Sequence, residues 1–293
     1  GVKWAADNRS LIADRTDKDT KRRQLFYIYN AGSKVEQQII ISDETDEKWQ
    51  APLSAIFEPN PKDASQLFFC SEKDGYNHIY LATIEAETRP VGSVSDTSNR
   101  VQQEGGKALR SDVKITQLTK GNWQVEWAKW VATASQIVFL STQSGTSGRR
   151  FSAVGVSGDT TILPATSPYE PWRPVLTNLF RPGMISNPQM DEQNERPTLL
   201  FGWSQWNRPD DLYVQSVCVP QCKETDPTIT QLTSTVPAAF SKLVWNAPKF
   251  IDIPSRDGKQ IKSKIYLPAG HDSKKKYPMA IFVHGAGYLQ NTI

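Results

Sequence analysis

The residues best suited to chemistry lie near the end of the sequence, in the run MAIFVHGAGYLQ at positions 279–290. Five apolar residues lead into a turn that opens with His284 and contains two glycines. A strand that breaks into such a turn can aim backbone N–H groups at the carbonyl oxygen of a substrate. Glycine lets the backbone approach that oxygen closely and adopt positive φ. The pattern therefore predicts an oxyanion-binding loop for acyl transfer at residues 284–288.

Two kinds of donor are available in this loop. We expect Gly285, Ala286 and Gly287 to contribute backbone groups, and the side chain of either His284 or Tyr288 to face the oxyanion. For His284 the alternative is a hydrogen bond that only orients the loop. Both interpretations stay open at the level of sequence.

A second motif, Gly202-Trp203-Ser204, resembles part of a nucleophile elbow, in which a serine occupies a sharp strand-to-helix turn. That turn requires a small residue two positions after the serine, where this sequence has Trp206. We therefore interpret Ser204 as the end of a β-strand and expect no catalytic residue in the segment.

The other polar candidates have structural interpretations. His78 lies in a strand-rich region and His271 in a polar loop, so we expect structural or solvent-exposed roles for both. Asp210 and Asp211 are adjacent, and at a strand start they point to opposite faces and cannot act as a catalytic pair. No metal-binding or nucleotide-binding motif is present, and no cofactor is expected.

Composition limits the class of protein. The 293 residues carry 34 basic and 31 acidic side chains, a net charge of +3 that is too small and too scattered to indicate nucleic-acid binding. No stretch approaches the roughly 18 apolar residues of a membrane span. Nineteen prolines and seventeen glycines are typical of many short strands joined by turns.

The cysteines leave the cellular compartment open. Cys218 and Cys222 are close enough in sequence for a short hairpin disulfide, which would indicate the periplasm or the cell exterior. Free, half-buried thiols are the equal alternative and would be compatible with the cytoplasm.

Strand-like runs of four to seven β-branched or aromatic residues recur along positions 1–247, in four units at a spacing of roughly 40 to 65 residues. Four strands per unit are typical of β-propeller blades, so we predict a mainly β fold with about four blades present. An all-β sandwich would need the same strands but would not repeat the closing strand, which reads ITQLTKG and ITQLTST. The units are residues 2–41 (VKW, SLIAD, QLFYIYN, QQIII), 53–118 (SAIFEP, QLFFCS, HIYLATI, KITQL), 125–163 (VEWAKWV, QIVFLST, RRFSAVGV, TTIL) and 172–232 (WRPVL, TLLFGWS, DLYVQSV, TITQL).

Two segments depart from this repeat. Residues 85–112 are polar and predict a long hairpin insertion within the second unit. From residue 248 two alternating strands flank the turn Arg256-Asp257-Gly258-Lys259, and the fully apolar MAIFV predicts a strand buried in a mostly parallel sheet. Residues 248–293 are therefore expected to begin a second domain.

In combination these motifs resemble the prolyl oligopeptidase family of serine peptidases, closest to its dipeptidyl peptidase IV branch. The resemblance rests on the sequences IPSRDGKQIKSKIYLPAG and KKYPMAIFVHGAGYLQN, together with DGYNHIY, QLTKGNWQVEW and RPDDLYV in the propeller region. It covers nearly the whole chain.

The resemblance implies a propeller that caps an α/β-hydrolase domain and limits access to its cavity, and peptides as substrates. It also implies a Ser-His-Asp triad that follows the oxyanion loop, so residues 248–293 would be the first strands of that domain and the triad would lie outside this segment. Relatives place tyrosine or histidine at the position of His284. The dipeptidyl peptidase branch grips the substrate amino terminus with an adjacent Glu-Glu pair, and this sequence contains none.

Two other functions remain open from the sequence. One is a propeller interaction module without catalysis, and the other is an acyl-peptide hydrolase or esterase on the same scaffold. In each case we expect the segment alone to be inactive and to fold with further chain, either the remainder of the same protein or a second copy.

Overall fold

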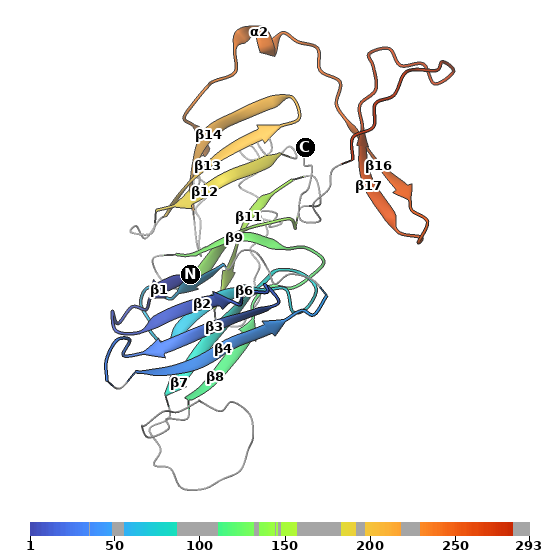
Figure 1. Ribbon diagram of the computed structural model, residues 1–293. Coiled ribbons are helices and arrows are strands. Elements are labelled where there is room, and N and C mark those ends of the chain that lie inside the picture. The colour runs from blue at the N-terminus through green and yellow to red at the C-terminus, as the bar shows by residue number, and fades with distance from the viewer. Residues whose placement is uncertain are drawn as a thin grey trace.

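The structure is a computed structural model that describes residues 1–34, 36–48, 56–86, 111–131, 135–143, 145, 148–156, 183–191, 197–217 and 229–283. Figure 1 shows its strands gathered into successive antiparallel sheets, with one separate hairpin towards the C-terminus. The prediction of a mainly β, propeller-like architecture is confirmed.

Each sheet is built from strands that follow one another in the chain, as in a propeller blade. The first sheet is β1 (Val2–Trp4), β2 (Leu11–Thr16), β3 (Arg22–Tyr29) and β4 (Gln37–Thr45). The second is β5 (Phe57–Pro59), β6 (Gln66–Ser71), β7 (His78–Ala86) and β8 (Ser111–Gln117). The third has β9 (Val125–Trp130), β10 (Gln136–Ser141) and β11 (Arg150–Gly155) among the described residues, and the fourth has β12 (Met184–Met190), β13 (Thr198–Gln205), β14 (Arg208–Ser216) and β15 (Ile229–Gln231).

The core lies between neighbouring sheets. In β6, Leu67 and Phe69 pack towards the first sheet, whereas Phe68 and Cys70 pack towards the third. Successive strand residues point to opposite faces, so a strand covered on both sides must be apolar throughout. This explains why residues 67–70 of β6 (LFFC) are a continuous apolar run and not an alternating one.

Strand β10 repeats the arrangement one sheet further on. Ile137 and Phe139 face the second sheet, while Val138 and Leu140 face the fourth. Four sheets stacked in series, with the middle two covered on both faces, are incompatible with a two-sheet sandwich. The packing therefore favours propeller blades over the sandwich alternative.

The connection after the fourth sheet contains a single turn of helix, α2 (Ala238–Ser241), and leads to the hairpin of β16 (Lys249–Pro254) and β17 (Gln260–Ile265). The predicted turn between these strands is confirmed, and Gly258 occupies the left-handed region with φ of 82°. The last facing pair of β7 and β8 is Ala86 and Ser111, so the predicted insertion connects the two strands of a hairpin. Residues 87–110 of the insertion are outside the described ranges.

The described strands differ from the predicted ones at two places. Residues 279–283 (MAIFV) form no strand, because no described segment lies alongside to pair with them. The first strand of the fourth sheet is β12, MISNPQM, which was not predicted. Asn187, with φ of 47°, and a register shift between Ser186 and Gln189 interrupt its pattern. The predicted WRPVL and TTIL strands lie outside the described residues.

Candidate functional site

The predicted oxyanion loop, His284, Gly285, Ala286, Gly287 and Tyr288, lies outside the described residues. So do Cys218 and Cys222, and their pairing stays a prediction. The structure does describe the polypeptide that leads to the loop, up to Val283.

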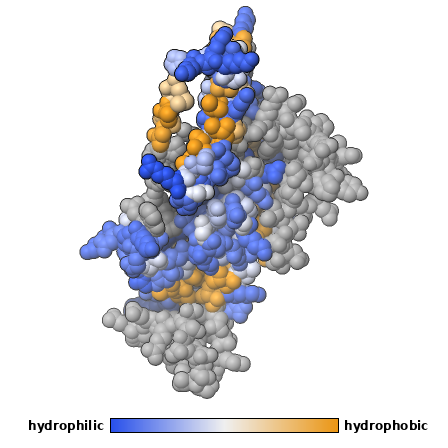
Figure 2. All heavy atoms as spheres, turned by 90° about the vertical axis from the view of Figure 1, so that its right-hand side faces the viewer, coloured by the Kyte–Doolittle hydropathy of each residue, from blue (hydrophilic) through white to orange (hydrophobic). Residues whose placement is uncertain are grey.

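The β16–β17 hairpin has six facing residue pairs, from Lys249 and Ile265 to Pro254 and Gln260. Its apolar side chains are exposed, including Phe250, Ile253 and Ile261. Figure 2 shows one group of hydrophobic side chains in the upper part of the molecule, at the height of this hairpin in Figure 1, and a second group lower down. An exposed apolar group of this kind indicates a surface that another part of a protein covers.

The segment before the loop has the same character. The side chains of Met279, Ile281, Phe282 and Val283 are at least 75% exposed. Their apolar sequence is suited to a buried strand, so the chain carries a strand-like segment without neighbouring strands in the described ranges.

Ser204 lies inside β13, where its residue pairs with Met184 of β12. β13 continues through a tight turn into the antiparallel strand β14, and no helix follows it. A nucleophile elbow requires a strand-to-helix turn. The interpretation of Ser204 as a strand end is therefore confirmed.

The two described histidines have structural surroundings. His78 is fully buried, with Nδ1 3.1 Å from Thr119 Oγ1 and Nε2 2.9 Å from the carbonyl oxygen of Gly121. Because a carbonyl oxygen only accepts, Nε2 carries the proton. The ring also meets Trp123 edge-on at 4.8 Å. His271 instead stacks on the exposed Tyr277 at a ring distance of 5.1 Å.

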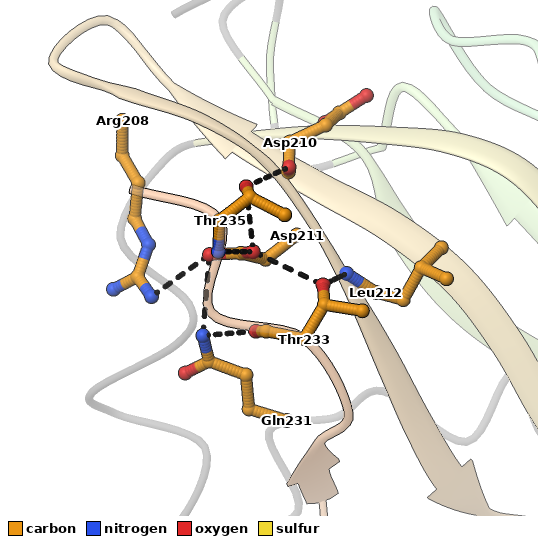
Figure 3. A network of polar contacts seen from close by, with 7 residues as sticks. All are labelled: Arg208, Asp210, Asp211, Leu212, Gln231, Thr233 and Thr235. Atoms are coloured by element: carbon orange, nitrogen blue, oxygen red, sulfur yellow. Dashed lines mark hydrogen bonds and ion pairs between the residues drawn. The ribbon is translucent and has the colours of Figure 1, made fainter. Parts of the chain in front are cut away.

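Asp210 and Asp211 point to opposite faces of β14, as predicted. Asp210 is exposed and accepts a hydrogen bond from Ser186 Oγ. Asp211 has a fully buried side chain and is the centre of a polar network between β14 and the residues after β15, shown in Figure 3. It accepts hydrogen bonds from Thr235 N (2.8 Å), Thr235 Oγ1 and Thr233 Oγ1 (both 3.0 Å), and Gln231 Nε2 (3.2 Å).

The charge of Asp211 is stabilised within this network. The backbone N–H of Thr235 is the largest influence that lowers the pKa of Asp211 below its ordinary value, and burial opposes it. The hydroxyls of Thr235 and Thr233 and the guanidinium of Arg208, 3.4 Å away, lower the pKa further. A carboxylate with all its acceptors occupied in this way is suited to holding backbone, and not to proton transfer.

The surroundings of His78 and Asp211 are equivalent in the two sheets. Tyr80 faces Gln117 in the second sheet, and Tyr213 faces Gln231 in the fourth. One residue further on, the amides of Leu118 and Leu232 each donate to the strand carbonyl across the sheet, at 2.8 Å in both cases.

The threonine of each closing strand makes the same hydrogen bond in both sheets. Thr119 Oγ1 accepts from the amide of Ile79 (2.9 Å), and Thr233 Oγ1 accepts from the amide of Leu212 (2.8 Å). The repeated QLT of the closing strands is visible in the sequence, but its partners in HIY and DLY are not. We call this arrangement, formed by residues 78, 117, 119 and 121 and by residues 211, 231, 233 and 235, the blade latch.

Within the described ranges no helix is both long and apolar enough to cross a membrane. Among the same residues no three His, Cys, Asp or Glu side chains are grouped so that they could hold a metal ion.

Comparison with known proteins decides the family. The family model of the dipeptidyl peptidase IV (DPP IV) N-terminal region matches residues 1–172, more than half of the chain. The chain belongs to the dipeptidyl peptidase IV family. This confirms the resemblance to the prolyl oligopeptidase group and to its dipeptidyl peptidase IV branch.

A solved structure of a candidate dipeptidyl aminopeptidase IV from Bacteroides ovatus shares the fold of this family member, with a TM-score of 0.59 and 22% sequence identity. The match covers 95% of this chain and 35% of that one, so the chain spans about a third of the length of its structural relative. No curated protein sequence matches the chain.

Proposed function

We propose that this chain is the propeller part and the beginning of the catalytic domain of a serine-type peptidase that cleaves peptides through an acyl-enzyme. One observation carries the proposal. A stack of propeller sheets of the dipeptidyl peptidase IV family runs into an exposed apolar hairpin and then into a strand-like segment that ends at His284. These exposed elements have the character of sheet strands at the start of an α/β-hydrolase domain, whose boundary we place at residue 248.

In this proposal the loop at 284–288 stabilises the negative charge that develops on the substrate carbonyl oxygen. Backbone N–H groups of Gly285, Ala286 and Gly287 donate to it, and His284 or Tyr288 adds a side-chain donor. The nucleophile, base and acid belong to the rest of the protein. The propeller limits which peptides reach the site. The sequence has no adjacent Glu-Glu pair, so the proposal does not extend to release of dipeptides.

The test uses the complete protein and a fluorophosphonate probe, with chromogenic peptide substrates. The complete protein should be labelled on a serine outside this chain, and residues 1–293 alone should not be labelled. Labelling of Ser204 would refute the assignment of the nucleophile. A complete protein that is neither labelled nor active would support a propeller interaction module instead.

The role of the loop is tested separately. His284→Ala should lower kcat by roughly 100- to 1000-fold with a smaller change in KM, because an oxyanion donor acts mainly on the transition state. Tyr288→Phe is the matched variant. If His284→Ala loses less than about threefold and Tyr288→Phe loses more, Tyr288 is the donor and His284 only orients the loop.

A further inference from the structure

The connection between the fourth sheet and the β16–β17 hairpin is held at both of its ends. At its start the buried carboxylate of Asp211 binds Thr233 and the backbone of Thr235. Towards its end Trp245 meets Trp206, in the turn between β13 and β14, edge-on at a ring distance of 6.5 Å. Phe240 packs on the same indole at 4.9 Å. The connection is therefore fastened to the fourth sheet on either side of α2.

A further contact joins this connection to the polypeptide beyond the hairpin. Asn246 Nδ2 donates a hydrogen bond of 3.2 Å to the carbonyl oxygen of Leu267, two residues after the end of β17. Contacts thus extend from Asp211 through the connection to Leu267, where the segment that leads towards His284 begins.

The equivalent latch in the second sheet shows what such an arrangement does. There His78 holds the backbone at Gly121, and two residues later Trp123 stacks on Phe139 of the third sheet at 5.9 Å. The latch directs the chain from one blade onto the next. In the fourth sheet the same latch is followed by the hairpin and not by another described blade.

The central side chains of the two latches, His78 and Asp211, form different hydrogen bonds. His78 donates to a carbonyl oxygen, whereas Asp211 accepts from a backbone amide and two hydroxyls at once. A carboxylate forms charge-assisted bonds, which are stronger than neutral ones. The latch that leads towards the hairpin therefore has more hydrogen bonds at its central side chain than the latch between blades.

We propose that Asp211 is a positioning residue: through Thr233 and Thr235 it fixes the connection to the β16–β17 hairpin, and so the position of the start of the proposed hydrolase domain relative to the propeller. This inference rests on the proposed function, because it assigns a catalytic consequence to the contact. The anchoring itself can be measured without any activity.

The experiment compares matched latch variants in the complete protein. Thr233→Val and Thr119→Val each remove the hydroxyl that accepts a strand amide, in the fourth and second sheets respectively. Thr233→Ser keeps the hydroxyl and is the conservative variant. Asp211→Asn and Asp210→Asn form a second pair, on the buried and exposed faces of one strand. Hydrogen–deuterium exchange of residues 236–247 and kcat and KM for a chromogenic peptide are the readouts.

We expect Thr233→Val and Asp211→Asn to accelerate exchange in residues 236–247 about tenfold and to lower kcat at least about fivefold, with a smaller change in KM. Thr233→Ser, Thr119→Val and Asp210→Asn should leave both readouts close to wild type. Equal exchange rates of residues 236–247 in Thr233→Val and Thr119→Val would overturn the inference. Faster exchange in Thr233→Val or Asp211→Asn with an unchanged kcat would also overturn it.

Failure of the proposed function gives a different result. If the complete wild-type protein cleaves no peptide and binds no fluorophosphonate, the peptidase assignment fails, and the exchange comparison alone then decides whether Asp211 anchors the connection. If Asp211→Asn does not fold, the threonine pair still gives the comparison.

Discussion

In each of the two described blade latches, a single buried side chain holds the backbone that follows the closing strand. His78 and Asp211 occupy equivalent places, and both hold the backbone two residues beyond a threonine. They differ in charge, and burial without partners would be costly for the carboxylate. The hydrogen bonds and Arg208 around Asp211 satisfy it and make its ionisation part of the stability of the fold.

Stability should therefore depend on pH through Asp211. Its folded pKa is lower than its ordinary value of 3.8, so its contribution is complete above about pH 4 and is lost as pH falls through the lower folded pKa. We choose conditions between pH 2.5 and 6, around this value, for urea denaturation of the complete protein. The free energy of unfolding of Asp211→Asn should fall less steeply towards acid pH than that of the wild type. Asp210→Asn should follow wild type. The same decrease in the free energy of unfolding at acid pH in all three proteins would contradict a stabilising role for ionised Asp211.

Cys70 should be inert in the folded protein. Its thiol is fully buried among apolar side chains, and this burial raises its pKa far above the ordinary value of 9.0, an effect that the nearby Arg23 only partly offsets. Because the thiolate is the reactive form, iodoacetamide should leave Cys70 unmodified at pH 8, a condition at which an ordinary thiol reacts, and should alkylate it in denaturant. Peptide mass spectrometry measures this site separately from Cys218 and Cys222. Rapid modification in native buffer would show that the second and third sheets open readily.

Neighbouring sheets are joined by polar contacts as well as by apolar packing. The carboxylate of Glu58 in β5 lies 2.6 Å from Lys129 Nζ and accepts from the amide of Trp130 in β9 at 3.1 Å. The indole of Trp130 in turn donates to the carbonyl oxygen of Glu58 at 3.1 Å and packs on Phe68. These contacts set the alignment of the first strands of two sheets.

Trp130→Phe should destabilise the protein by about 1–3 kcal/mol, because it removes the indole donor from a part-buried carbonyl and some buried area. Trp4→Phe, in the more exposed strand β1, should change stability by less than about 0.5 kcal/mol. Urea denaturation gives both values. Equal effects for the two variants would mean that the Glu58 contact contributes nothing measurable.

The strands of the sheets could be predicted because burial on one or both faces leaves a period of two or a continuous apolar run, as in β6 and β10. β12 was missed because the left-handed conformation of Asn187 and the register shift between Ser186 and Gln189 break that period. The latch could not be derived, since His78 and Thr119 are 41 residues apart and nothing local specifies their contact. The loop at 284–288 was predicted from glycine spacing and stays a prediction.

At the scale of the whole molecule, buried and exposed apolar surface are unevenly distributed. The four sheets bury their aromatic and aliphatic side chains between them, whereas the hairpin and residues 279–283 leave theirs open. The described residues therefore form a packed stack and an extension whose apolar side chains are exposed, which is typical of a surface that another partner or domain contacts.

Isolated residues 1–293 should self-associate and bind a hydrophobic dye through this extension. Phe282→Ser combined with Val283→Ser removes two of its most exposed apolar side chains and should reduce dye binding at least about twofold. Lys274→Ser, in the polar loop before them, is the control. Sedimentation velocity and dye fluorescence measure the effect. A monomeric wild-type chain without dye binding would be inconsistent with an open apolar extension.

The hairpin of β7 and β8 has a practical consequence for imaging and engineering. Its strands stay paired up to Ala86 and Ser111, so the two ends of the intervening segment are already brought together. The entropy of closing a loop rises only slowly with its length, so a longer insert adds little cost once its ends are fixed. A small folded protein with adjacent termini could replace residues 87–110 and serve as a fiducial for electron microscopy, on a hairpin in a different sheet from the one that carries the Asp211 latch.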